Sequence, residues 1–140
     1  MRHRLYIHLV WTTREREAMI VPDTAVFLDR FIRSICRQER ALVLALGMVR
    51  DHVHVLLRIH PTTDIPRLVQ RLKGGSSVVA NRESPVGRGR LRWAKGYSVE
   101  SVSPRQVEGA RAYVLAQGTH HPTLAIPGWP RGRRLKPALG

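Results

Sequence analysis

The chain has 140 residues, about the size of one domain, and 43% of them are hydrophobic, which argues against disorder and against two ordinary domains. Its 24 lysines and arginines against 10 aspartates and glutamates give a formal charge of +14, which is typical of proteins whose partners are polyanions. Nucleic acid is therefore the first candidate partner, and an anionic membrane surface is the second.

The N-terminal half predicts three strands and one helix. Residues 4–13 alternate loosely between two faces, as a strand that is covered on both sides does. After a charged loop, Asp23 is expected to cap a helix over 24–39, in which apolar residues follow at helical spacing. The continuous apolar run 41–49 predicts a buried strand, and the clean alternation over 52–59 predicts another.

The C-terminal half predicts two more helices and one more strand. Asp64 opens a helix whose continuity is doubtful at 73–77, because two glycines and two serines follow a lysine there. Residues 82–96 are expected to form a basic, flexible connection to a short strand over 97–102. Serine, proline and glutamine then mark the start of a helix over 104–117.

The order β-α-β-β-α-β-α predicts an α+β domain with a ferredoxin-like antiparallel sheet and two helices on one face. In that topology, the strands over 4–13 and 52–59 lie in the centre. The helix over 104–117 is expected against the other face of the sheet, which the first two helices leave open. Residues 122–140, rich in proline, glycine and arginine, are predicted to be a basic tail outside a domain over 1–121.

Two histidines and a tyrosine helix carry the most specific chemistry. His52 and His54 point to the same side of their strand, so both imidazoles can reach one metal ion. Tyr113 and Gln117 are four residues apart on the last helix and share a face. A divalent ion held by the two histidines and Gln117 could polarise a phosphodiester, and Tyr113 could attack phosphorus to form a phosphotyrosine ester. Taken singly, the histidines could be a solvated pair and Tyr113 a packing residue.

Several blocks occur in a characteristic order around these residues. They are Tyr6-Ile-His-Leu-Val-Trp-Thr-Thr, Asp51-His-Val-His-Val-Leu-Leu, Leu72-Lys-Gly-Gly-Ser-Ser, Trp93-Ala-Lys-Gly-Tyr-Ser-Val-Glu-Ser-Val-Ser, Tyr113-Val-Leu-Ala-Gln117 and His120-His121. Over roughly residues 4–121, this order resembles the single-tyrosine HUH transposases of the insertion-sequence 200/605 type. Each block alone is loose, whereas all of them in order are specific.

The resemblance implies a DNA transposase that cleaves and rejoins single-stranded DNA near hairpins with Mg²⁺ or Mn²⁺. Tyr113 would become linked to the 5′ phosphate, while His52, His54 and Gln117 would hold the metal. The resemblance also implies a homodimer, in which the tyrosine helix of one subunit can complete the site of the other. A cytoplasmic, nucleoid-associated protein of a prokaryote is expected, since the sequence has neither a signal peptide nor the roughly 18 apolar residues of a membrane span.

Residues outside this centre have both a functional and a structural interpretation. The predicted DNA contacts, through phosphates or unpaired bases, are Lys73, Arg88, Arg90, Arg92, Lys95 and Tyr97, each of which could instead be solvated or packed. His8 is expected to share a sheet face with Tyr6 and Val10 on the neighbouring central strand, where it could orient the metal site or the scissile phosphate, or have a plain structural role. His120 and His121 follow the helix and are left outside the predicted metal shell. The lone cysteine, Cys36, is expected to be an apolar filler.

Two alternative functions remain compatible with the sequence. A domesticated relative, of the type tied to repeated extragenic palindromes, would carry the same active-site residues and a host role. A non-catalytic nucleic-acid-binding module on a ferredoxin-like sheet would belong to a different class. Such modules display aromatic side chains on the sheet face. This face is predicted to show His52, His54 and Arg58 instead, which favours the enzyme.

Overall fold

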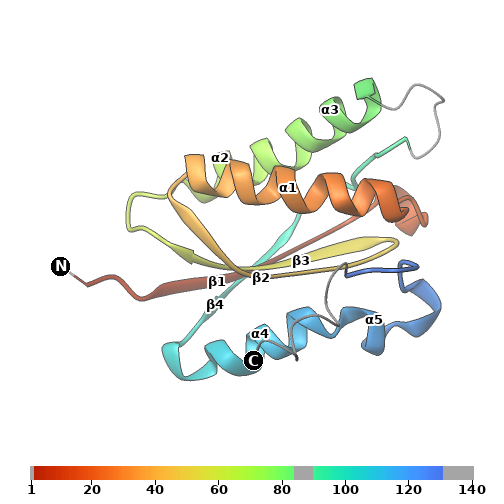
Figure 1. Ribbon diagram of the computed structural model, residues 1–140. Coiled ribbons are helices and arrows are strands. Elements are labelled where there is room, and N and C mark those ends of the chain that lie inside the picture. The colour runs from red at the N-terminus through yellow and green to blue at the C-terminus, as the bar shows by residue number, and fades with distance from the viewer. Residues whose placement is uncertain (1, 84–89, 131–140) are drawn as a thin grey trace.

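The computed structural model describes residues 2–83 and 90–130 and contains a four-stranded antiparallel sheet in the order β2-β3-β1-β4 (Figure 1). The strands are β1 (Leu5–Thr12), β2 (Ala41–Val49), β3 (His52–Ile59) and β4 (Ser98–Val102). β1 and β3 lie in the centre, as predicted, and their register pairs Val10 with His54.

Helices cover both faces of the sheet (Figure 1). The helices on one face are α1 (Pro22–Gln38), α2 (Ile65–Gln70) and α3 (Ser76–Glu83), and those on the other are α4 (Val107–Leu115) and α5 (Gln117–His120). Short 3₁₀ turns span Arg14–Arg16, Pro104–Gln106 and Pro122–Leu124. The ferredoxin-like arrangement with an additional helix on the open face is thus confirmed.

The main core lies between the sheet and the first helical layer. Alternation along β1 and β3 directs Leu9, Trp11 and Val55 toward buried residues of α1 such as Leu28 and Ile32. Cys36 is buried in the same core, and burial raises the pKa of its thiol to about 12, which keeps the thiol protonated and supports its role as a filler. Trp93 packs edge-to-face against Trp11 with ring centroids 5.9 Å apart, so it anchors the chain that leads into β4.

Helix boundaries differ from the sequence predictions in two places. The first helix begins at Pro22, so Asp23 lies in the first turn, where its carboxylate faces the positive end of the helix dipole, and does not serve as the N-cap. The helix after Asp64 continues through a π-helical turn at Arg71–Gly75 into α3, although the sequence left its continuity in doubt. Gly75 fits that turn because a Cβ there would lie 2.9 Å from the Phe31 ring of α1.

The last helix is also divided. A 3₁₀ turn precedes α4, and the backbone departs from helical geometry at Ala116, with φ −98° and ψ 20°. The chain then resumes as α5, which begins at Gln117. The predicted continuous helix over 104–117 is therefore a helical segment with a bend just before Gln117.

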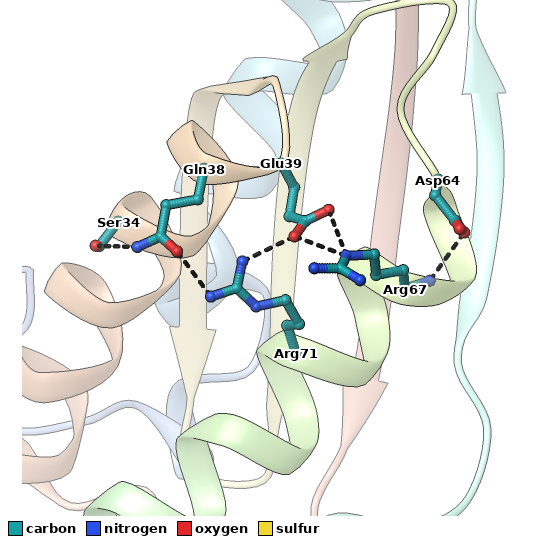
Figure 2. Close-up of polar contacts among 6 residues, drawn as sticks. All are labelled: Ser34, Gln38, Glu39, Asp64, Arg67 and Arg71. Atoms are coloured by element: carbon teal, nitrogen blue, oxygen red, sulfur yellow. Dashed lines mark hydrogen bonds and ion pairs between the residues drawn. The ribbon is translucent and has the colours of Figure 1, made fainter.

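An ion-pair network joins the end of α1 to α2 and the π-helical turn (Figure 2). Glu39 accepts hydrogen bonds from Nη1 of Arg71 at 2.7 Å and from Nε of Arg67 at 3.1 Å. Arg71 also donates to Gln38 at 2.7 Å, and Asp64 caps α2 by accepting from the backbone N–H of Arg67 at 3.1 Å. The network fixes where the second helix of this layer begins.

Replacing Glu39 by glutamine is expected to lower the midpoint of thermal unfolding at pH 7. Hydrogen bonds from Arg71 and then Arg67 hold the pKa of Glu39 below its usual 4.5. The contribution of the Glu39 carboxylate to the stability of the fold is therefore fully present above pH 4.5. The effect is lost as pH falls through the lowered pKa, and the difference between wild type and variant should disappear in acid. Circular dichroism melts from pH 7 to pH 3 measure this. Glu83→Gln, at an exposed glutamate of α3, is the control, and equal melts at pH 7 for Glu39→Gln and wild type would contradict the prediction.

The start of the predicted tail packs against the domain. The backbone carbonyl of Leu124 accepts a hydrogen bond from the Arg50 N–H at 2.8 Å, and Ile126 is 3% exposed within the main core. The tail prediction is therefore wrong for this stretch, because apolar anchors among prolines bind it to the domain. Residues 131–140, with their basic cluster, lie outside the described residues. Among the residues that the structure describes, no helix is long and apolar enough to cross a membrane.

Candidate active site

The open face of the sheet receives α4 through a small apolar cluster and one glycine. Ala45 of β2, Leu56 of β3, and Val107 and Val114 of α4 form the cluster. At Gly47 of β2, a Cβ would overlap the backbone carbonyl of Val114, so only glycine lets the helix lie this close to the strand. This close approach brings the end of α4 and the start of α5 over the β3 histidines.

His52 is held by the acidic residue that precedes it. Its Nδ1 lies 2.7 Å from Oδ1 of Asp51, whose other oxygen accepts a hydrogen bond from Nε of Arg16 at 3.1 Å. Burial opposes ionisation of Asp51, but the hydrogen bonds from His52 and Arg16 prevail and lower its pKa. The carboxylate is therefore placed to accept a hydrogen bond from Nδ1 of His52, and Nε2 of His52 faces Gln117.

Gln117 of α5 faces Nε2 of His52. Its side chain is 1% exposed, and its amide nitrogen donates to the Tyr113 carbonyl at 3.0 Å, which turns Oε1 toward His52. Oε1 lies 3.4 Å from Nε2 of His52, longer than a well-made hydrogen bond. An imidazole nitrogen and an amide oxygen thus face each other, and both are atom types that can bind a divalent cation.

His54 lies beside His52, with ring centroids 5.0 Å apart. Its Nδ1 is 2.8 Å from Nε2 of His8 on the neighbouring strand. Burial, followed by the nearby His52 and His8, lowers the pKa of His54 to about 3. The ring is therefore neutral near pH 7, which is the form that can bind a metal.

Tyr113 lies over the histidines and remains accessible. Its ring centroid is 5.7 Å from that of His54 and 6.1 Å from that of His8, in edge-to-face contacts. The side chain is 45% exposed, so a phosphate of a bound strand could reach its hydroxyl. The structure therefore brings together all four residues that the sequence singled out, Tyr113, His52, His54 and Gln117.

Two histidines that sequence reasoning left outside the site lie within it. His120 lies 5.0 Å from Tyr113, and His121 lies 5.0 Å from His52, measured between ring centroids. The bend at Ala116 turns the chain so that both rings return toward the sheet. The sequence does show two histidines just after Gln117. The direction in which their side chains point depends on the bend at Ala116, which the sequence pattern did not reveal.

The predicted DNA contacts are spread over the surface. Lys73 donates to the carbonyls of Ala94 and Gly96 at 2.8 and 2.7 Å, which gives it a structural role in fixing the loop before β4. Arg90 and Arg92 line a cavity of about 530 Å³ together with Arg14. Lys95 and Tyr97 are exposed, and Arg88 lies outside the described residues. A DNA contact at each of these residues stays a prediction.

The donor set defines what kind of metal site is feasible. Across residues 2–83 and 90–130, no three histidine, cysteine or acidic side chains are placed to hold a metal. A metal at this site would therefore need the amide oxygen of Gln117 beside His52 and His54. Two imidazoles and one amide oxygen are suitable ligands for Mn²⁺, and they leave room for phosphate oxygens or water.

The chain is similar in sequence to known transposases. The family model "Transposase IS200 like" matches residues 1–117. The chain is 28% identical over 120 residues to the ISDra2 transposase TnpA of Deinococcus radiodurans, covering 82% of this chain and 85% of that one. It is 25% identical over 99 residues to a transposase for the insertion sequence element IS200 of Salmonella typhimurium, covering 68% of this chain and 65% of the relative.

Solved structures extend the comparison. The crystal structure of a putative transposase from Deinococcus radiodurans matches with a TM-score of 0.66 and 30% identity, over 81% of this chain and 91% of that chain. A REP-associated tyrosine transposase bound to a REP hairpin matches with a TM-score of 0.66 and 10% identity, over 86% and 70% of the two chains, and so shares the fold. On the strength of the match over residues 1–117, the chain belongs to the IS200-like transposase family.

Proposed function

We propose that this transposase cleaves and rejoins single-stranded DNA at hairpin-bearing ends through a 5′-phosphotyrosine intermediate on Tyr113, with a divalent metal. The observation that carries the proposal is the position of Tyr113 and Gln117 directly over His52 and His54. A phenol beside a set of metal-type ligands suits nucleophilic attack on a phosphodiester. The +14 charge of the chain suits a polyanionic substrate.

The residues present fit a divalent metal. His52 and His54 each have Nδ1 engaged by a partner, so Nε2 is the nitrogen that would bind a metal, and the amide of Gln117 is oriented with Oε1 toward His52. Mg²⁺ or Mn²⁺ held by these three residues would polarise a non-bridging oxygen of the scissile phosphate. The outward orientation of Nδ1 in both histidines is the arrangement that metal-ligating histidines adopt.

Tyr113 provides the covalent step. Its hydroxyl oxygen would attack phosphorus and lose its proton, while the bond from phosphorus to the 3′ oxygen breaks and that oxygen leaves as a hydroxyl. One phosphodiester is exchanged for another, so the energy of the broken bond is kept for rejoining and no nucleoside triphosphate is required. Attack by a 3′ hydroxyl on the phosphotyrosine would reverse the step and join two strands.

The substrate and the assembly are inferred from relatives. A hairpin is the DNA bound in the solved REP-associated relative, and hairpin-bearing single strands are the proposed partner here. A homodimer is proposed from the family resemblance, and prokaryotic chromosomal DNA is the proposed place of action. The four active-site groups lie together within one chain. An exchange of tyrosine helices between subunits would present the same groups.

The proposal predicts a covalent protein–DNA adduct that depends on metal. Purified protein, Mn²⁺ and single-stranded oligonucleotides from both flanks of the gene should give an adduct that survives boiling on a denaturing gel. Excess chelator should abolish the adduct, and the same sequences as perfect duplexes should give none. An adduct that forms equally with chelator would refute the role of the metal. Tight hairpin binding without any adduct would indicate a binding module instead of an enzyme.

A further inference from the structure

We propose that His8 is a positioning residue that sets the proton position of His54. In this inference, Nε2 of His8 accepts a hydrogen bond from Nδ1–H of His54, which keeps Nε2 of His54 unprotonated and available to a metal. The inference rests on the proposed metal site and extends it to a residue on a different strand. It assigns to β1 a part in a site otherwise built from β3, α4 and α5.

The geometry between the two rings is that of a direct hydrogen bond. Nε2 of His8 and Nδ1 of His54 are 2.8 Å apart, and the ring planes differ by 25°. The ring centroids are 5.0 Å apart. This distance equals the nitrogen–nitrogen distance plus the distance from each nitrogen to the centre of its own ring, so the two nitrogens lie on the line between the ring centres. The imidazoles therefore meet edge to edge, and the shared hydrogen lies close to both ring planes.

The direction of this bond decides whether His54 can bind a metal. Only one hydrogen fits between the two nitrogens, so one ring donates and the other accepts. If His8 donated, a neutral His54 would carry its proton on Nε2, which would block that nitrogen. If His54 donates, its Nε2 is bare, as ligation requires.

The residue that lies beside His8 on β4 favours a hydrogen bond in which His54 donates and His8 accepts. Glu100 of β4 is paired with His8 in the sheet register, and β4 lies on the side of β1 away from β3. Both residues line a groove of about 480 Å³. A carboxylate there stabilises a proton on the His8 nitrogen that is not bonded to His54, so Nε2 of His8 is left as the acceptor.

In this arrangement, the Nδ1 proton of each histidine, His52 and His54, has a hydrogen-bond acceptor. Asp51 accepts the Nδ1 proton of His52 at 2.7 Å, and His8 accepts that of His54 at 2.8 Å. Neighbouring groups that fix the ring of a metal ligand typically contribute 10- to 100-fold to metal affinity. His8 is thus expected to matter for metal binding without contacting the metal.

Mn²⁺ titration monitored by electron paramagnetic resonance tests this in the whole chain. His8→Leu removes the acceptor and should weaken Mn²⁺ binding by about 10- to 100-fold. His8→Gln offers a carbonyl oxygen at a similar reach and should stay within a few-fold of wild type. Tyr6→Phe, on the same strand and face, should bind as wild type does. Thermal melts of each variant report whether it is folded.

Nitrogen-15 NMR of labelled histidines tests the proton position without metal. Wild-type His54 is expected to carry its proton on Nδ1, and His8→Leu should shift it to Nε2. A wild-type His54 protonated on Nε2, or wild-type Mn²⁺ affinity in His8→Leu, would overturn the inference. Absence of Mn²⁺ binding by the wild type would overturn the metal part of the proposed function as well, which separates the two failures.

Discussion

Tyr113→Phe is expected to lower strand cleavage by more than about 10³-fold while leaving hairpin affinity within about threefold of wild type. The substitution removes only the attacking oxygen. The ring that packs against His54, His8 and His120 is kept, so the position of α4 should not change. Cleavage on denaturing gels and hairpin binding by fluorescence anisotropy measure the two effects separately.

Tyr6→Phe is the matched control for this variant. Tyr6 lies on β1, and its side chain packs with the small apolar cluster beneath α4. The same loss of a phenolic hydroxyl there should leave cleavage at the wild-type rate. Wild-type cleavage by Tyr113→Phe would remove this tyrosine from the chemistry, and a parallel loss of binding would indicate a role in DNA contact instead.

Gly47→Ala is expected to reduce both stability and cleavage, although Gly47 contacts no substrate. The added Cβ would overlap the Val114 carbonyl and lie 3.2 Å from Cγ of Gln117, so α4 and the start of α5 must move away from β2. Overpacking of this kind costs about 1–3 kcal/mol of unfolding free energy. Displacing Tyr113 and Gln117 by about 1 Å relative to β3 should lower cleavage by about 10²-fold.

The same substitution at Gly109 provides the control. Gly109 lies in α4 itself, and a Cβ there would meet no atom within 4 Å. Gly109→Ala should stabilise the protein by up to about 1 kcal/mol, because alanine favours helix more than glycine does, and cleavage should persist. Denaturant unfolding and the gel assay check both variants. An unaffected Gly47→Ala would mean that α4 does not pack against β2 as described.

The sequence predicted the fold and four of the site residues because those features depend on local periodicity. Alternation along β3 places His52 and His54 on one face of the sheet, and helical spacing places Tyr113 and Gln117 on one face of the last helix. Once the element order indicated a ferredoxin-like sheet, only one face was free for the last helix. That topology therefore predicted that the two histidines would lie close to the tyrosine and the glutamine.

Other contacts depend on tertiary detail that periodicity does not carry. The bond between His8 and His54 requires the exact register of β1 against β3, in which His54 pairs with Val10. The return of His120 and His121 to the site requires the bend at Ala116. These features are set by long-range packing, so the sequence left the role of His8 open and did not indicate the ring contacts of His120 and His121.

Charge and composition were the least specific guides. For Lys73 the sequence left a DNA contact or a solvated side chain open, and the structure adds hydrogen bonds from its ammonium group to two backbone carbonyls more than twenty residues away. Ile126 lies in a proline-rich stretch that was predicted to be a tail, yet it is buried in the core. In both cases, the structure shows tertiary contacts that the local composition of the sequence did not indicate.

Peptide mapping of the adduct formed with Mn²⁺ identifies the attacking residue directly. Tyr6, Tyr97 and Tyr113 fall on different tryptic peptides, because arginines or lysines separate them. After nuclease trimming and trypsin digestion, mass spectrometry should locate the nucleotide phosphate on the peptide that begins at Ala112, at Tyr113. A nucleotide on either of the other tyrosines, or cleavage that proceeds with no modified peptide, would contradict phosphotyrosine catalysis at this site.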